Sequence, residues 1–458
     1  MRQALDPAQA RRATVDLYAL AGRRVAVELS RSKRGGARSI EAIVAADRPW
    51  LPASSKALAV PEPVLGNTRW MTIACKFRDI AEEQVPISFL REQYGTNPPQ
   101  LGHYWRELSY DKINLAGSSA HGWFILPQPR SYYVVSEADG VSYADLDKLF
   151  KDCTAAADPR VDFNSVQGIN LVFNGELDGY VYGGSSCGLL EGTNRCIRNT
   201  WLTAGTITQL AWVVHEMGHA YGLPHSNNSD GDNNTYDNPW DVMSGAGFNA
   251  VSHATYGALP KHVSMIQRDR LGWVDAARKL VLTRTQVATD IVLDRASLGA
   301  TGNLQMILLE AESWEGPGVE LKFSLEVRKR GGNYEAALAG DAVIIHQVYP
   351  GSAYSLDADK PPADLSNNEG SMFKVGESWL SRDGHYMVRV KAETAEGFIV
   401  SIARPRFTGG PLRPRVRPSA VSATPGPQAE SAEGRAGPGC AGSRSARCRR
   451  SIAQPGQR

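Results

Sequence analysis

Residues 206–225 read TITQLAWVVHEMGHAYGLPH. The apolar positions of this stretch recur with the 3.6-residue period of a helix that buries one face. The pattern therefore predicts a helix over residues 206–221. His215 and His219 lie four residues apart within it, so both imidazoles are expected to project from one face, one turn apart.

The residues around and after this helix complete a set of metal ligands. Gly222 is expected to end the helix, because glycine adopts the left-handed conformation without a Cβ penalty. The chain can then bend back and supply a third imidazole from His225. Three neutral ligands leave the fourth position for water, which is the arrangement of a catalytic rather than a structural zinc site. We therefore expect His215, His219 and His225 to bind one zinc ion, with Glu216 as the general base.

The run from 215 to 225, His-Glu-x-x-His-x-x-Gly-x-x-His, resembles the zinc signature of the metzincin metallopeptidases. Members of that clan have a methionine beneath the metal, and Met243 in the run DVMSG is the counterpart that the resemblance implies. The runs NPWDVM (238–243) and GHYWRELSY (102–110) are most similar to the immune inhibitor A–like family of bacterial secreted metallopeptidases. Gametolysin-like peptidases are the nearest competing family. The resemblance covers about residues 67–404.

This resemblance implies a secreted zinc endopeptidase that acts on proteins or peptides. No tyrosine closely follows Met243, so the sequence assigns no tyrosine as a zinc ligand or oxyanion donor. An alternative is a catalytically inactive peptidase-like protein that binds cell-surface protein or glycan through a β-sandwich.

Composition divides the 458 residues into four parts. Residues 1–66 are basic and then Pro-rich, which suggests an N-terminal pro-segment or ancillary region. Residues 67–275 alternate strand and helix signals, which indicates an α/β, metzincin-like catalytic domain whose mixed sheet carries the active-site helix. Residues 276–405 contain strand signals separated by turns, which predicts an all-β, sandwich-like domain. Residues 406–458 are rich in Pro, Gly, Ser, Ala and Arg and are predicted to be a disordered tail.

Charge and hydropathy bear on the partners and the cellular location. The formal net charge is +2, which gives no reason to expect nucleic acid as a partner. No stretch approaches the roughly 18 apolar residues that would span a bilayer. The first twenty residues lack the apolar core of a secretory signal peptide, although the resemblance leads us to expect export. We expect a monomer.

The cysteine pattern favours one disulfide and leaves a second pair open. Cys187 and Cys196 bracket a short segment and are predicted to form a disulfide, which suits an oxidising compartment. Cys75 and Cys153 lie in apolar-patterned segments and are equally consistent with buried free thiols.

Three weaker signals leave alternatives open. Oxygen ligands at alternate positions could hold calcium, but Thr235 stands where an EF-hand loop needs glycine, so a solvated loop is the preferred interpretation. The oxygen-bearing residues of that loop are Asp230, Asp232, Asn234 and Asp237. Ser186 lies in a G-x-S-x-G run that suggests a serine hydrolase, but the residues after it are poor helix formers. The run 180–182 could be a strand edge to which a peptide substrate adds, or an ordinary covered edge.

Overall fold

The structure is a computed structural model that describes most of the chain up to residue 405. The described residues are 25–29, 40–45, 63–136, 142–229, 236–311, 321–349, 352–356 and 369–405. The expected N-terminal segment lies mostly outside these residues, and the expected tail lies wholly outside them. Strands β1 (Val25–Leu29) and β2 (Ile40–Ala45) pair with each other in antiparallel fashion.

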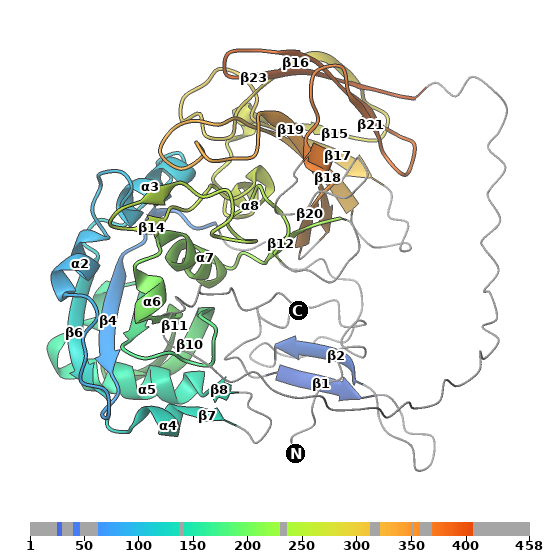
Figure 1. The fold of residues 1–458 in the computed structure, drawn as a ribbon. Coiled ribbons are helices and arrows are strands. Elements are labelled where there is room, and N and C mark those ends of the chain that lie inside the picture. The colour runs from blue at the N-terminus through green and yellow to red at the C-terminus, as the bar shows by residue number, and fades with distance from the viewer. Residues whose placement is uncertain are drawn as a thin grey trace, which may run out of the picture. The chain divides into compact units, whose positions relative to one another are not determined.

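A five-stranded mixed sheet organises residues 63–275 (Figure 1). Its strands, in spatial order, are β10 (Tyr182–Leu190), β11 (Thr193–Thr203), β9 (Gly168–Phe173), β4 (Trp70–Lys76) and β6 (Ser119–Ile125). Strand β10 runs antiparallel to β11, whereas the other neighbours are parallel. β10 is therefore the strand at one edge of this sheet.

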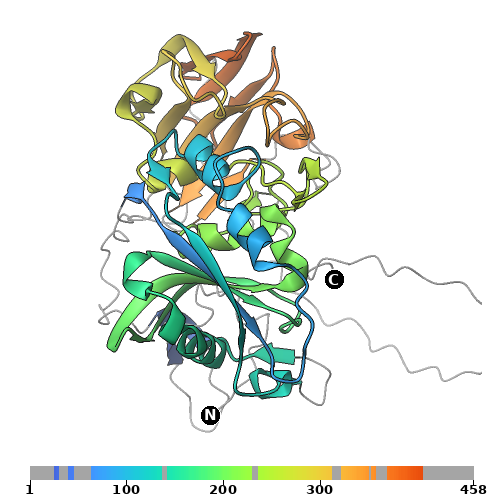
Figure 2. The ribbon, with the colours of Figure 1, turned by 90° about the vertical axis from the view of Figure 1, so that its left-hand side faces the viewer.

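Helices cover both faces of the sheet (Figure 2). One face packs against α2 (Ile87–Glu92), α3 (Leu101–Leu108), α6 (Ala204–Ile207) and α7 (Leu210–Ala220), and the other against α4 (Arg130–Tyr133) and α5 (Leu146–Ala157). Alternate residues of β4 enter the two cores: Trp70 and Ala74 join the first, and Ile73 and Cys75 join the second. This layering fixes α7 against one face of the sheet.

Shorter elements complete this half of the molecule. They are β3 (Gly66–Asn67), β5 (Ile113–Asn114), β7 (Val134–Ser136), β8 (Ser142–Ala144), β13 (Ser252–His253), β14 (Gly257–Ala258) and α8 (Met265–Arg270). Among the described residues, no helix has both the length and the apolar character needed to cross a bilayer.

Two further sheets organise the C-terminal half. The six-stranded sheet has the order β12 (Ser226–Asn228), β20 (Ser352–Ser355), β19 (Ala342–Tyr349), β18 (Leu321–Arg328), β17 (Met306–Ala311) and β15 (Lys279–Leu282). The four-stranded sheet has the order β16 (Ala288–Asp294), β23 (Gly397–Ala403), β22 (Met387–Glu393) and β21 (Ser378–Leu380). Both sheets bury side chains in one core, for example Phe323 and Val343 from the first and Val388 and Val400 from the second. The prediction of a mixed α/β chain is confirmed at this level.

The predicted helix over 206–221 is interrupted, which corrects the sequence interpretation. It forms the short α6 and then α7, with Gln209 extended between them at φ −116° and ψ 93°. The side chain of Gln209 accepts a hydrogen bond from the amide of Ala258 at 2.9 Å, and the amide of Leu210 donates to the carbonyl of Tyr256 at 3.0 Å. Contacts with a segment distant in sequence therefore start α7 later than its periodicity suggests.

Helix α5 begins at an aspartate cap. Ser142 belongs to strand β8, and Asp145 is the N-cap, accepting a hydrogen bond from the amide of Lys148 at 3.1 Å. Aspartate is among the preferred N-cap residues, because its carboxylate accepts from the free amides of the first helical turn.

Strand β10 and strand β11 form a hairpin that the sequence analysis did not identify beyond residues 180–182. Cys187 and Cys196 face each other across it and are joined by a disulfide. Ser186 is buried within β10 at 4% exposure, and a second strand rather than a helix follows the turn. The serine-hydrolase interpretation of Ser186 is therefore wrong, because its strand-to-helix elbow does not exist.

A second disulfide joins Cys75 of β4 to Cys153 of α5. The free-thiol interpretation of these two residues is wrong. The pairing depends on α5 packing across the sheet, with a sequence separation of 78 residues, so local spacing carries no signal for it.

Candidate metal centre

Helix α7 places His215, Glu216 and His219 within two turns. The helix ends at Ala220, and Gly222 has φ +96°, the left-handed conformation expected of a helix stop. The amide of Leu223 then donates to the carbonyl of Gly218 at 3.0 Å, which turns the chain back along the helix. This turn brings the next histidine towards the first two.

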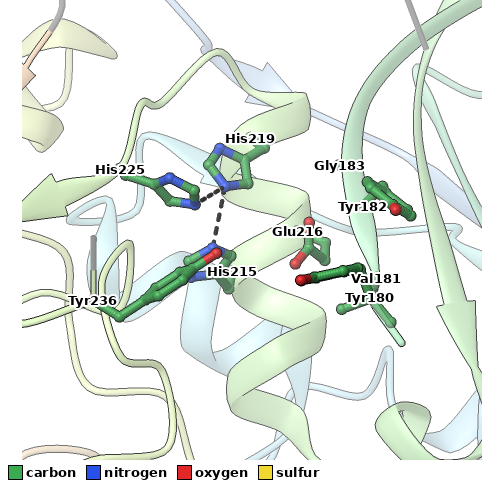
Figure 3. A pocket seen from close by; sticks show the side chains of 9 residues that line it. All are labelled: Tyr180, Val181, Tyr182, Gly183, His215, Glu216, His219, His225 and Tyr236. Atoms are coloured by element: carbon green, nitrogen blue, oxygen red, sulfur yellow. Dashed lines mark hydrogen bonds between the residues drawn. The ribbon is translucent and has the colours of Figure 1, made fainter. Parts of the chain in front are cut away.

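The three predicted histidine ligands converge (Figure 3). Nε2 of His219 lies 3.1 Å from Nε2 of His215 and 3.0 Å from Nε2 of His225. Among the described residues, these three histidines are the group whose ligand atoms lie close enough together to hold a metal ion.

The hydrogen bonds of the imidazoles determine which nitrogens face one another. Nδ1 of His215 donates to the carbonyl of Val242 at 2.7 Å, and Nδ1 of His219 donates to the carbonyl of Leu223 at 2.8 Å. A carbonyl only accepts, so both Nδ1 atoms carry the proton and both Nε2 atoms present a lone pair in the neutral ring. Burial, followed by the two neighbouring histidines, lowers the pKa of His215 well below its usual value. Neutral rings with facing lone pairs fit a shared cation.

Glu216 lies on the same helix beside this nitrogen cluster. Glu216 is 5% exposed, and burial raises the pKa of its carboxyl group well above the usual value. In Figure 3 its side chain lies between the histidines and the chain segment that leads into β10. A buried carboxyl group with a raised pKa is suited to proton transfer.

Met243 lies directly against the helix that carries the ligands. A Cβ atom added to Gly218 would lie 2.4 Å from Sδ of Met243, so only glycine permits this approach. Met243 is fully buried, and its amide donates a hydrogen bond to the carboxylate of Asp241 at 2.9 Å. The neighbouring carbonyl of Val242 is the one that orients His215. We call residues 241–245 the methionine turn.

A pocket opens beside the nitrogen cluster. It is lined by Tyr180, Val181, Tyr182, Gly183, His215, Glu216, His219, His225 and Tyr236 (Figure 3). A Cβ atom added to Gly183 would lie 1.9 Å from the carbonyl oxygen of Glu216, so the start of β10 lies in backbone contact with α7. The pocket is therefore bounded on one side by the sheet edge and on the other by the three histidines and Glu216.

Tyr236 is the pocket residue that the sequence analysis missed. Its ring packs against His225 at a centroid distance of 5.1 Å and against His215 at 6.4 Å. It precedes Met243 by seven residues, whereas the sequence prediction concerned only tyrosines that follow Met243. The position of Tyr236 between the third histidine and the methionine turn could have identified it from the sequence.

The suggested calcium loop lies mostly outside the described residues and stays a prediction. Its last member, Asp237, is buried and accepts a hydrogen bond from the amide of Asn228 at 2.7 Å.

Comparisons of the chain with protein-family models and with curated proteins gave no match.

Proposed function

We propose that this protein is a zinc-dependent endopeptidase. The observation that carries the proposal is the convergence of three Nε2 atoms beside a buried glutamate, in a pocket at the edge of a sheet. His215, His219 and His225 would hold the zinc ion. Three neutral nitrogen ligands are typical of a catalytic zinc site.

Zinc, when bound, acidifies the attacking water and polarises the scissile carbonyl. The chain itself supplies the proton transfers. Glu216 accepts the proton of the attacking water on its carboxylate and delivers it to the nitrogen of the leaving amine. The burial of Glu216 keeps bulk water away from this proton. It also lowers the effective dielectric constant, so that charge interactions of the carboxylate are stronger than in water.

The edge strand offers a binding mode for an extended peptide. β10 is the terminal strand of the five-stranded sheet as described, and residues 180–183, which lead into it, line the pocket. A substrate that adds as a further strand would place its backbone alongside Glu216. Protein and peptide substrates therefore suit this site better than small molecules.

We also propose a metzincin-like fold for residues 67–275, closest to the immune inhibitor A–like family, and a sandwich-like arrangement for residues 276–405. The glycine stop at Gly222 and the contact between Met243 and Gly218 support the first. The core shared by two sheets supports the second. The two disulfides support export to an oxidising compartment.

The decisive experiment compares the wild-type protein with Glu216→Gln. The variant should retain about one zinc per chain, because Glu216 is not a ligand, and should lose casein hydrolysis by a factor on the order of 10² to 10⁴. Glu176→Gln is the matched control, because Glu176 is exposed and lies outside the pocket.

Chelator treatment should abolish wild-type hydrolysis, and added zinc should restore it. Hydrolysis by Glu216→Gln at the wild-type rate would remove the general-base assignment. A wild-type protein that binds no zinc would remove the metal centre.

A further inference from the structure

The strand that follows the third histidine belongs to the sheet of the C-terminal half. β12 begins at Ser226, immediately after His225, and pairs in parallel with β20, with Ser226 opposite Ala353. The amide of Ser226 also donates to the carbonyl of Met243 at 3.0 Å. The chain around His225 is thus held between the six-stranded sheet and the methionine turn.

Asn238 is the side chain at which these two supports meet. Its Nδ2 donates to Oγ of Ser226 at 2.7 Å and lies 3.3 Å from Nε2 of His346 on β19. Its Oδ1 accepts from the amide of Trp240 at 3.0 Å, and its own amide donates to Oγ of Ser244 at 2.9 Å. Asn238 is fully buried, so every one of these bonds forms away from bulk water.

The protonation state of His346 determines which atom donates in its hydrogen bond with Asn238. Burial lowers the pKa of His346 to about 4, so the ring is neutral near pH 7 and its Nε2 can accept from the amide of Asn238. Asn238 thereby directs the two hydrogens of its side-chain amide to Ser226 and His346 of the six-stranded sheet, and its oxygen accepts from Trp240, which directly precedes the methionine turn. A hydroxyl has only one hydrogen to donate and a carboxylate has none, so neither can replace this amide.

We propose that Asn238 is a positioning residue for the metal, holding the segment after His225 in register with the methionine turn that orients His215. The inference rests on the proposed zinc site and extends it, because the sheet of the C-terminal half becomes part of the support of that site. Residues that orient metal ligands typically change metal affinity about 10-fold to 100-fold when they are mutated.

The test measures the zinc dissociation constant of purified full-length protein by competition with a chromophoric chelator. Asn238→Ala should weaken zinc binding by about 10-fold or more. Asn174→Ala is the matched control. Asn174 is equally buried, and its side chain also makes three hydrogen bonds, to the amide of Phe77 and the carbonyls of Ile80 and Glu82.

Thermal unfolding of the zinc-free variants separates positioning from general destabilisation. Both variants should unfold at a lower temperature than the wild type. Only Asn238→Ala should lose zinc affinity, and the zinc affinity of Asn174→Ala should stay within about twofold of the wild-type value. Equal zinc affinity in the two variants would overturn the positioning role while leaving the zinc site intact. A wild-type protein without zinc affinity would overturn both.

Ser226→Ala keeps the proposal testable if Asn238→Ala does not fold. It removes the hydroxyl that accepts from Asn238 and leaves the backbone pairing of β12. We expect zinc affinity about tenfold weaker than that of the wild type, the low end of the usual range for such partners. Affinity within twofold of the wild type would count against the proposal.

Discussion

Gly218→Ala tests whether Met243 lies beneath the metal-binding helix. In an unobstructed helix, replacing glycine with alanine stabilises by about 1 kcal/mol. Here the new Cβ would lie 2.4 Å from Sδ of Met243, whereas its distance to Cδ1 of Leu223, 3.8 Å, is an ordinary contact. Overpacking of this kind costs about 1–3 kcal/mol. The net effect should therefore be a destabilisation of about 0–2 kcal/mol.

The same substitution should change sign when the methionine is removed. In a Met243→Ala background the obstruction is gone, so Gly218→Ala should stabilise by about 1 kcal/mol. The assay is a double-mutant cycle on denaturant unfolding of the zinc-free protein, with an expected coupling of about 1–3 kcal/mol. Gly205→Ala in α6 is the control, because its nearest atom lies at an unstrained 3.5 Å and Met243 is not among its neighbours. Additivity within about 0.5 kcal/mol for Gly218→Ala would refute the reasoning.

Three further outcomes can be measured independently. Tyr236→Phe keeps the ring packed on His225 and should leave zinc affinity unchanged, whereas Tyr236→Ala removes the ring and should weaken zinc binding; equal zinc affinities of the two variants would contradict this packing role. The double variant Cys75→Ala/Cys153→Ala should lose up to about 4 kcal/mol of unfolding free energy, because the disulfide closes a loop with a sequence separation of 78, and a loss below about 1 kcal/mol would contradict the pairing. Burial lowers the pKa of His346 from 6.5 to about 4. The neutral, buried ring therefore contributes to the free energy of unfolding above pH 6.5, and this contribution is lost as the pH falls towards 4. His346→Gln should remove up to about 3 kcal/mol of that pH dependence, measured as the difference between wild-type and variant unfolding, and an unchanged slope would exclude the assignment.

The metal centre was predictable because its geometry is local. Four residues of helix determine how His215 and His219 face each other, and one glycine determines where the chain turns towards His225. The strand signals of residues 67–275 are likewise local, because buried strands such as β4 and β9 consist of continuous apolar runs.

The missed features depend on contacts between distant segments. The Cys75–Cys153 disulfide requires α5 to lie on the sheet, and the break before α7 requires the loop at Tyr256. The β10 strand contains glycines that lower its apparent strand propensity, yet Gly183 is needed there because it touches the carbonyl of Glu216. Tyr236 reaches the site through a loop whose path no local pattern specifies.

The pairing of β12 with β20 determines when, during synthesis, the strand after His225 can join its sheet. Ser226 and the residue opposite it are separated by 127 positions in the chain. At a synthesis rate of roughly 5–20 residues per second, the ribosome takes roughly 6–25 s to produce the partner of a strand it has already released. During that interval the segment after the third histidine has no sheet to join. The proposed proteolytic activity should therefore arise only after Ala353 has been made, and the nascent chain would be protected from that activity until then.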